Sequence, residues 1–274
     1  IAWKQPDFLI QLGLKSKAAV VATSTMGNIP VYFSQFDGLA VSSTAEQTPE
    51  VLGIMIDNHP DARPQAGLSQ ARVVYEAPVE GGLTRYFALF NASQIVAKVG
   101  PVRSARPYFL DWLAEYGRTS YWHSGGSPDA LELIKQYSLW DVNEFFLEPY
   151  FWRSSDREAP HNLYTNSEKW GTLIEGTPHD LQDWDGWKFE RAFSASASSS
   201  EVIDLRIRLY GVGWTYDSVL KRYARFINNK LSTDEAGQKI LSDNVVVQFV
   251  DTEVIDEEGR RELSAVGEGE ARFL

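Results

Sequence analysis

Short apolar runs separated by glycine, proline and polar turns fill residues 51–124, and this pattern constrains the fold more than any other feature of the sequence. Each run is four to eight residues long, which is the usual length of a buried strand and too short for a buried helix. Such runs predict a sheet whose strands are covered on both faces. The predicted strands lie at 51–56, 73–77, 83–90, 94–99 and 119–124.

Two helices are predicted around the last of these strands. Phe109, Trp112, Leu113 and Tyr116 recur at three- and four-residue spacing, which indicates a helix with one buried face. The second helix is predicted over 127–137, with Ser127 as the N-cap and proline at the first helical position.

The rest of the chain divides at a serine-rich stretch, SASASSS at 194–200, whose composition is typical of a linker. After it come alternating and apolar runs and a hairpin turn at 256–260. We therefore predict a mixed α+β protein: an α/β N-terminal domain at 51–193 with residues 1–50 packed on it, and a smaller β-rich C-terminal domain at 201–274.

Charge and composition exclude several classes of function. The net charge is −11 and the pI is about 4.9, which argues against nucleic-acid binding, so any bound anion needs a local cationic cluster. The chain has no cysteine, which excludes a thiolate nucleophile and cysteine-ligated metal. It also has no apolar run of 18 residues that would span a membrane.

The strongest candidate for an anion site is GPVRSARP at 100–107, where Arg103 and Arg106 precede a predicted helix. The second helix follows HSGGSP, in which Gly125, Gly126 and Ser127 could present backbone N–H groups. If both helices begin at the carboxyl edge of one sheet, these groups converge, and the guanidinium groups could grip a phosphate or carboxylate. The alternative is that the arginines form structural pairs with Glu76, Glu80 or Asp111.

Other polar residues lie at the ends of predicted strands. Asn58, His59 and Arg63 follow the strand at 51–56, and Arg85 interrupts the apolar run at 83–90. Glu76 and Glu80 are candidates for acid/base catalysis, with His123 assisting. The chain has no nucleophile-elbow or Walker motif. Because His59, His123 and His161 lie far apart without metal-ligand spacing, we predict neither a metal site nor a cofactor.

Four ordered segments, MIDNHPDARPQ, VGPVRSARPYFLDW, HSGGSPDALELI and APHNLYT, resemble the YerB-like lipoprotein family of bacterial DUF3048 proteins. The resemblance covers about residues 51–170, and two later segments resemble that family's C-terminal domain. It implies a protein anchored outside the cytoplasmic membrane through an N-terminal signal or anchor missing here, and a C-terminal domain that is incomplete in this sequence. It assigns no catalytic residue.

Three functional hypotheses follow. The first is an extracytoplasmic envelope protein that binds an anionic small molecule or a glycan cell-wall polymer. Its ligand-binding residues would be Asn58, Arg63, Arg85, Arg103, Arg106, Gly125, Gly126 and Ser127. The second is a hydrolase or transferase on the same ligand class, with Glu76, Glu80 and His123 as catalytic candidates. The third is a protein-interaction module with structural arginines and an exposed aromatic patch at 145–152. Whether the protein is an enzyme is left open.

Overall fold

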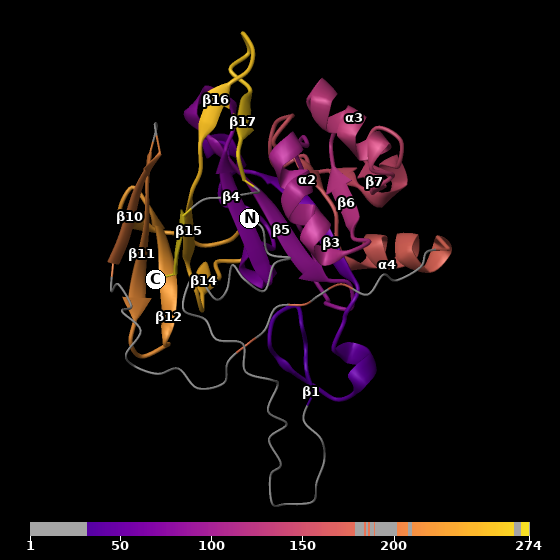
Figure 1. Cartoon of the computed structure of the whole chain (residues 1–274), viewed down its shortest axis with the longest axis horizontal. Coiled ribbons are helices and arrows are strands. Elements are labelled where there is room, and N and C mark those ends of the chain that lie inside the picture. The colour runs from indigo at the N-terminus through magenta and orange to yellow at the C-terminus, as the bar shows by residue number, and fades with distance from the viewer. Residues whose placement is uncertain are drawn as a thin grey trace, which may run out of the picture.

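A computed structural model of the chain describes residues 32–178, 184, 186, 189, 202–207, 210–265 and 270–273. The predicted linker at 194–200 and most of the predicted N-terminal segment, residues 1–31, lie outside the described residues. The architecture is mixed, with more strands than helices and a β-rich C-terminal part (Figure 1).

The central element is a five-stranded sheet with the strand order β4-β5-β3-β6-β7. β5 pairs antiparallel with both β3 and β4, whereas β6 is parallel to β3 and β7 is parallel to β6. β3 lies in the middle of the sheet and is buried along its whole length, which explains its run of apolar residues. The strands are β3 (Val51–Asp57), β4 (Val73–Pro78), β5 (Thr84–Asn91), β6 (Ser120–His123) and β7 (Trp140–Asn143).

Helices cover both faces of this sheet (Figure 1). α2 (Pro107–Leu113), which continues into the 3-10 turn η5 (Ala114–Tyr116), and α3 (Pro128–Gln136) pack on the face that carries Met55 and Phe87. α4 (Ser167–Gly176) packs on the other face through Trp170. The predicted cap of α3 is confirmed, because the Ser127 hydroxyl accepts a hydrogen bond from the backbone N–H of Ala130 at 3.4 Å.

The predicted strand at 94–99 is wrong. Val96 and Val99 are buried as expected, but Ile95 between them is 88% exposed, and Val99 forms only an isolated bridge to Thr165. The apolar residues of this segment fill the core from a loop, because the edge of the sheet beside β5 is already taken by β4.

The C-terminal part contains a second sheet, in which β10, β11, β12 and β13 pair in order and β14 joins β12. These strands are β10 (Val202–Ile207), β11 (Tyr210–Asp217), β12 (Arg222–Ile227), β13 (Lys230–Leu231) and β14 (Leu241–Ser242). Two further pairs follow. β15 (Val246–Phe249) pairs with β18 (Glu270–Phe273), and β16 (Thr252–Val254) pairs with β17 (Arg261–Leu263), which confirms the predicted hairpin turn.

Short elements complete the described chain. They are the strand pairs β1 (Tyr32–Phe33) with β2 (Ala40–Val41) and β8 (Trp152–Arg153) with β9 (Leu163–Tyr164), and the 3-10 turns η1 (Thr44–Glu46), η2 (Pro60–Ala62), η3 (Leu68–Gln70), η4 (Glu80–Gly82) and η6 (Glu148–Tyr150). Phe36, between β1 and β2, is buried and contacts Tyr116 edge to face.

The C-terminal part packs against the central sheet from two sides. Ile240 belongs to the apolar cluster that includes Trp170, and Leu263 and Ala265 belong to the cluster formed by α2 and α3. None of the helices in the described residues combines the length and the apolar composition that crossing a bilayer requires.

Candidate functional site

The polar residues gather at one edge of the central sheet. β3, β6 and β7 are parallel and end there, at Asp57, His123 and Asn143. β5 is antiparallel and begins there, so that Arg85 pairs in register with Asp57. The loop that carries Arg103 and Arg106 meets the loop that carries Gly125 and Gly126, as expected, since Ala105 and Gly126 form a parallel bridge.

Asp57 is the central carboxylate of this edge. It is buried, its Oδ1 accepts the backbone N–H of His59 at 2.9 Å, and its Oδ2 lies 2.7 Å from Nδ1 of His161 and 3.0 Å from Nε of Arg103. Burial raises the pKa of this carboxyl, but the His59 N–H, the Arg103 charge and the His161 hydrogen bond outweigh it, and the net pKa is lowered. Asp57 is therefore ionised at neutral pH.

Arg85 is a buried cation with few partners. It is 7% exposed, and its Nη1 donates to the carbonyl of Ser104 at 2.8 Å. Its Nε has no hydrogen-bond partner, and no carboxylate oxygen lies within 4.0 Å among the described residues. Burial lowers its pKa, although the nearby Asp57 charge raises it in part. A guanidinium group nevertheless stays protonated in proteins, so a positive charge remains at this point.

Asn58 is the hub of a second group of contacts, which joins the two parts of the chain. Its side-chain amide lies 2.7 Å from Oγ1 of Thr84 and 3.1 Å from the hydroxyl of Tyr210. Its Oδ1 accepts from Nε of Arg63 at 2.9 Å and from Gln65 at 3.1 Å. Arg63 also lies over the Tyr210 ring, 4.4 Å from its centroid. Asn58 and Arg63 thus have partners within the chain, and those of Arg63 are uncharged.

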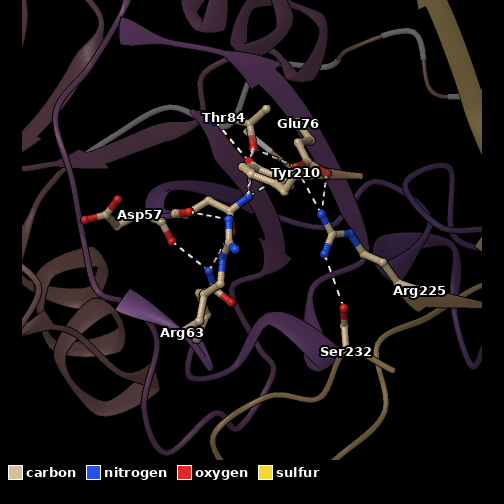
Figure 2. Close-up of polar contacts among 9 residues, drawn as sticks. Asp57, Arg63, Glu76, Thr84, Tyr210, Arg225 and Ser232 are labelled. Atoms are coloured by element: carbon tan, nitrogen blue, oxygen red, sulfur yellow. Dashed lines mark hydrogen bonds and ion pairs between the residues drawn. The ribbon is translucent and has the colours of Figure 1, made fainter. Parts of the chain in front are cut away.

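The two glutamate candidates are held by different arginines. Glu76 is bound by Arg225 of β12, with Nη2 at 3.0 and 2.9 Å from its two carboxylate oxygens (Figure 2). Glu80 pairs with Arg106, as the structural alternative expected. Arg103 pairs instead with Asp57. The acid/base candidates therefore lie in separate ion pairs rather than in one shared site.

The third catalytic candidate, His123, is fully buried. Its Nδ1 faces the carbonyl of Gly125 at 2.8 Å, and its Nε2 faces Oδ1 of Asp141 at 2.7 Å. Both ring nitrogens are occupied by oxygen acceptors, so the ring ties β6 to β7 and to the glycine loop.

Two backbone N–H groups of the predicted glycine nest, those of Gly125 and Ser127, have partners in the protein. The N–H of Gly125 donates to Asn143 at 3.1 Å, and that of Ser127 donates to the carbonyl of Ala105 at 3.3 Å. In return, the N–H of Ala105 donates to the carbonyl of Gly125 at 2.9 Å. The two loops thus bind each other, and Gly125, Gly126 and Ser127 position the arginine segment.

His59 and His161 lie side by side, although no spacing in the sequence indicates that they meet. Their rings stack at a centroid distance of 4.5 Å and an interplanar angle of 15°. Asp61 completes the group, because one potential ligand atom from each of the three residues lies within 4.8 Å of the others. The fold therefore brings together two histidines that lie far apart in the sequence.

Two arginines lie near the buried carboxylate of Asp57. They are Arg85 and Arg103, and of these only Arg103 forms an ion pair with it in the described residues. A further cation, Arg157, donates to the carbonyls of Ala62 and Pro64 rather than to a carboxylate. In a chain of net charge −11, an anion site would require local cations.

Several residues of the edge were not expected from the sequence. Asp57 carried one usable signal, a charge at the end of an otherwise apolar strand. Thr84, Tyr210 and Arg225 carried none, because two of them come from the distant C-terminal part.

Comparison with known proteins shows what the chain is similar to. The chain matches the model of "Protein of unknown function (DUF3048) N-terminal domain" over residues 36–180 and that of the corresponding C-terminal domain over residues 203–274. It is 30% identical over 266 residues to a protein of Bacillus subtilis (strain 168) named "Putative lipoprotein YerB", covering 93% of this chain and 77% of the relative. The crystal structure of YerB from Bacillus subtilis matches with a TM-score of 0.73 and 29% identity, over 85% of this chain and 79% of the other.

Proposed function

The chain belongs to the DUF3048 family, and we propose that it is a cell-envelope protein that binds an anionic ligand at the edge of its central sheet. The observation that carries the proposal is the presence there of two guanidinium groups, those of Arg85 and Arg103, near the buried carboxylate of Asp57, with which only Arg103 forms an ion pair in the described residues. The contacts of Arg63 there are with uncharged groups. The proposed location rests on the name of the Bacillus subtilis relative, which is called a lipoprotein.

A buried cation without a counter-ion is costly, and a bound anion would offset that cost. In the part of the chain that the structure describes, Arg85 has a partnerless Nε and one hydrogen bond, to a carbonyl. Arg103 is 27% exposed, and its Nε lies near Asp57 without forming an aligned hydrogen bond. An arriving phosphate or carboxylate would therefore gain charge-assisted hydrogen bonds from Arg103 while it compensates Arg85.

The ligand class follows from the location and the chemistry. Outside the cytoplasmic membrane the abundant anions are phosphate-bearing polymers and acidic glycans of the cell wall. Arg63 lies over the buried ring of Tyr210 and is itself partly exposed, so its guanidinium group is available to donate to an oxygen of a sugar-phosphate.

Isothermal titration with inorganic phosphate, a muropeptide and a teichoic-acid fragment tests the proposal directly. We expect saturable binding of at least one of the three, weakened at least tenfold in Arg103→Ala. A thermal scan gives an independent reading, since a ligand at 100 times its Kd adds about 2.7 kcal/mol to native stability.

Arg118→Ala is the matched control, because Arg118 is exposed and lies at the opposite end of β6. It should leave both binding and the thermal shift unchanged. Absence of binding by all three anions, together with a large loss of stability in Arg103→Ala, would mean that the arginines are structural, and the proposal would be wrong.

One observation favours protein binding as a second candidate. Phe145 and Phe146, in the loop after β7, are 69% and 81% exposed. The expected aromatic patch at 145–152 is nevertheless smaller than predicted, because Phe151 is buried and contacts Trp122. Replacing both exposed rings by serine should abolish capture of a partner without changing anion binding. Catalysis with Glu76, Glu80 and His123 stays a prediction that no contact favours.

A further inference from the structure

We propose that His59, Asp61 and His161 form a zinc-binding site on the same edge of the central sheet. The proposal rests on the geometry of these three side chains and does not require the anion site. Two of the ligands come from the η2 turn that follows β3, and the third comes from the loop before β9.

The first pair already has the separation of two zinc ligands. Nδ1 of His59 and Oδ2 of Asp61 lie 3.3 Å apart. Zinc bonds to imidazole nitrogen and carboxylate oxygen are about 2.0–2.2 Å, so two ligands of a tetrahedral site lie roughly 3.3–3.5 Å apart. An ion can therefore bridge these two atoms without a change of backbone.

The third ligand is close and can move the remaining distance. One potential ligand atom of His161 lies within 4.8 Å of those of His59 and Asp61, so closure of about an ångström completes the site. The side chains of His59 and Asp61 are 36% and 74% exposed, which leaves them free to rotate toward His161. The backbone N–H of Asp61, which now donates to Nδ1 of His59 at 3.2 Å, would then donate to water.

The ring of His161 is oriented as metal-binding histidines are. Its Nδ1 lies 2.7 Å from Oδ2 of Asp57, so that the Nδ1–H donates to the carboxylate and Nε2 keeps its lone pair for an ion. Asp57 also accepts the backbone N–H of His59 at 2.9 Å. One buried carboxylate thus positions both histidines, which is an observation independent of the ligand cluster itself.

The ligand types select zinc over harder cations. Mg²⁺ and Ca²⁺ take oxygen ligands, whereas two of the three ligand side chains here are imidazoles. Two imidazoles and one carboxylate match the three-ligand zinc sites that keep a fourth position for water.

Titration of the tag-free protein with ZnCl2 alone, in a buffer without phosphate, tests the proposal. We expect one zinc ion per chain, and the cobalt-substituted protein should give the strong visible absorption of a four-coordinate ion. Asp61→Asn and His161→Gln should each weaken zinc binding at least tenfold. Asp129→Asn on α3, which removes an exposed carboxylate elsewhere, should not.

Asp61 is exposed, so its replacement tests the site without endangering the fold. Failure to bind zinc stoichiometrically, or binding that survives both Asp61→Asn and His161→Gln, would overturn the proposal. Because no anionic ligand is present in this titration, such a result would leave the proposed anion binding to be judged by its own experiment.

Discussion

Arg225 on β12 and Glu76 on β4 form a buried ion pair that joins the C-terminal part of the chain to the central sheet (Figure 2). The arginine is 3% exposed and the glutamate 19%. Burial is the largest single effect on the pKa of Arg225 and lowers it. The contacts with Glu76 oppose burial, and the net pKa is raised. Glu76 therefore serves to connect two sheets, which is a different role from the acid/base catalysis considered from the sequence.

Replacing Arg225 by alanine should destabilise the protein by about 3–5 kcal/mol, because it leaves the Glu76 carboxylate without its buried partner. Urea denaturation measures this loss. Arg222→Ala is the matched control on the same strand, since its pair with Asp243 is 39% and 71% exposed and should contribute at most about 1 kcal/mol. Equal losses in the two variants would contradict the structural role of the buried pair.

The hydroxyl of Tyr210 should also stabilise this junction. It accepts a hydrogen bond from the backbone N–H of Thr84 at 3.2 Å and lies 3.1 Å from the Asn58 amide. Tyr210→Phe leaves that buried N–H without an acceptor, and we expect a loss of about 1–3 kcal/mol in the free energy of unfolding. Tyr137→Phe, at an exposed ring on α3's C-terminal side, should stay within about 0.5 kcal/mol of the wild type. If Tyr210→Phe left the free energy of unfolding unchanged, water would be accepting the hydrogen bond of the Thr84 N–H in place of the hydroxyl.

Much of the central sheet could be predicted from the sequence because its signals are local. The apolar runs gave β3, β4, β5 and β6 within one or two residues, and Ser127 with Pro128 gave the start of α3. The strand expected at 94–99 failed for a non-local reason. Whether an apolar run joins a sheet depends on an available edge, and β4 already occupies the edge beside β5.

The candidate site was predictable only in part. The sequence placed Arg103 and Arg106 at the right edge, because strand ends and helix starts have local signals. It could not select their partners, Asp57 and Glu80, from the available carboxylates. Contacts between residues far apart in the chain, such as Asp57 with His161, depend on how loops cross the edge, and a single sequence does not encode that in any readable spacing.

Glu115 should make stability depend on pH. Burial raises the pKa of this carboxyl to about 8, although the hydroxyl of Tyr75, 3.3 Å away, partly opposes the shift. The folded protein then keeps a proton up to about pH 8, whereas the unfolded chain releases it near the ordinary value of 4.5. Between these values the native state binds more protons, so its stability falls as the pH rises and levels off above pH 8.

Urea midpoints at pH 5.5, 7.0 and 8.5, compared between wild type and Glu115→Gln, measure this effect. Other titrating groups are common to both proteins and cancel in the difference. We expect the glutamine variant to lose stability less steeply over this range, while Glu132→Gln at an exposed position of α3 should follow the wild type. Parallel curves for wild type and Glu115→Gln would show that Glu115 titrates normally.

Gly53 should be required by the centre of the sheet. It lies in β3 between Leu89 of β5 and Tyr121 of β6, and a Cβ atom at this position would lie 2.5 Å from Cζ of Phe87 and 3.2 Å from a methyl of Leu89. Both neighbours are fully buried and cannot move aside. We expect Gly53→Ala to destabilise the protein by at least about 1–3 kcal/mol through overpacking.

Gly171→Ala is the matched control, because a Cβ atom at that position of α4 meets nothing within 4 Å. Alanine has the higher helix propensity, so this variant should gain about 0.5–1 kcal/mol, opposite in sign to Gly53→Ala. Urea denaturation of the two variants therefore separates the close approach of Phe87 from the general effect of replacing glycine. If both variants were stabilised, the predicted clash between a Cβ atom at position 53 and Phe87 would be wrong.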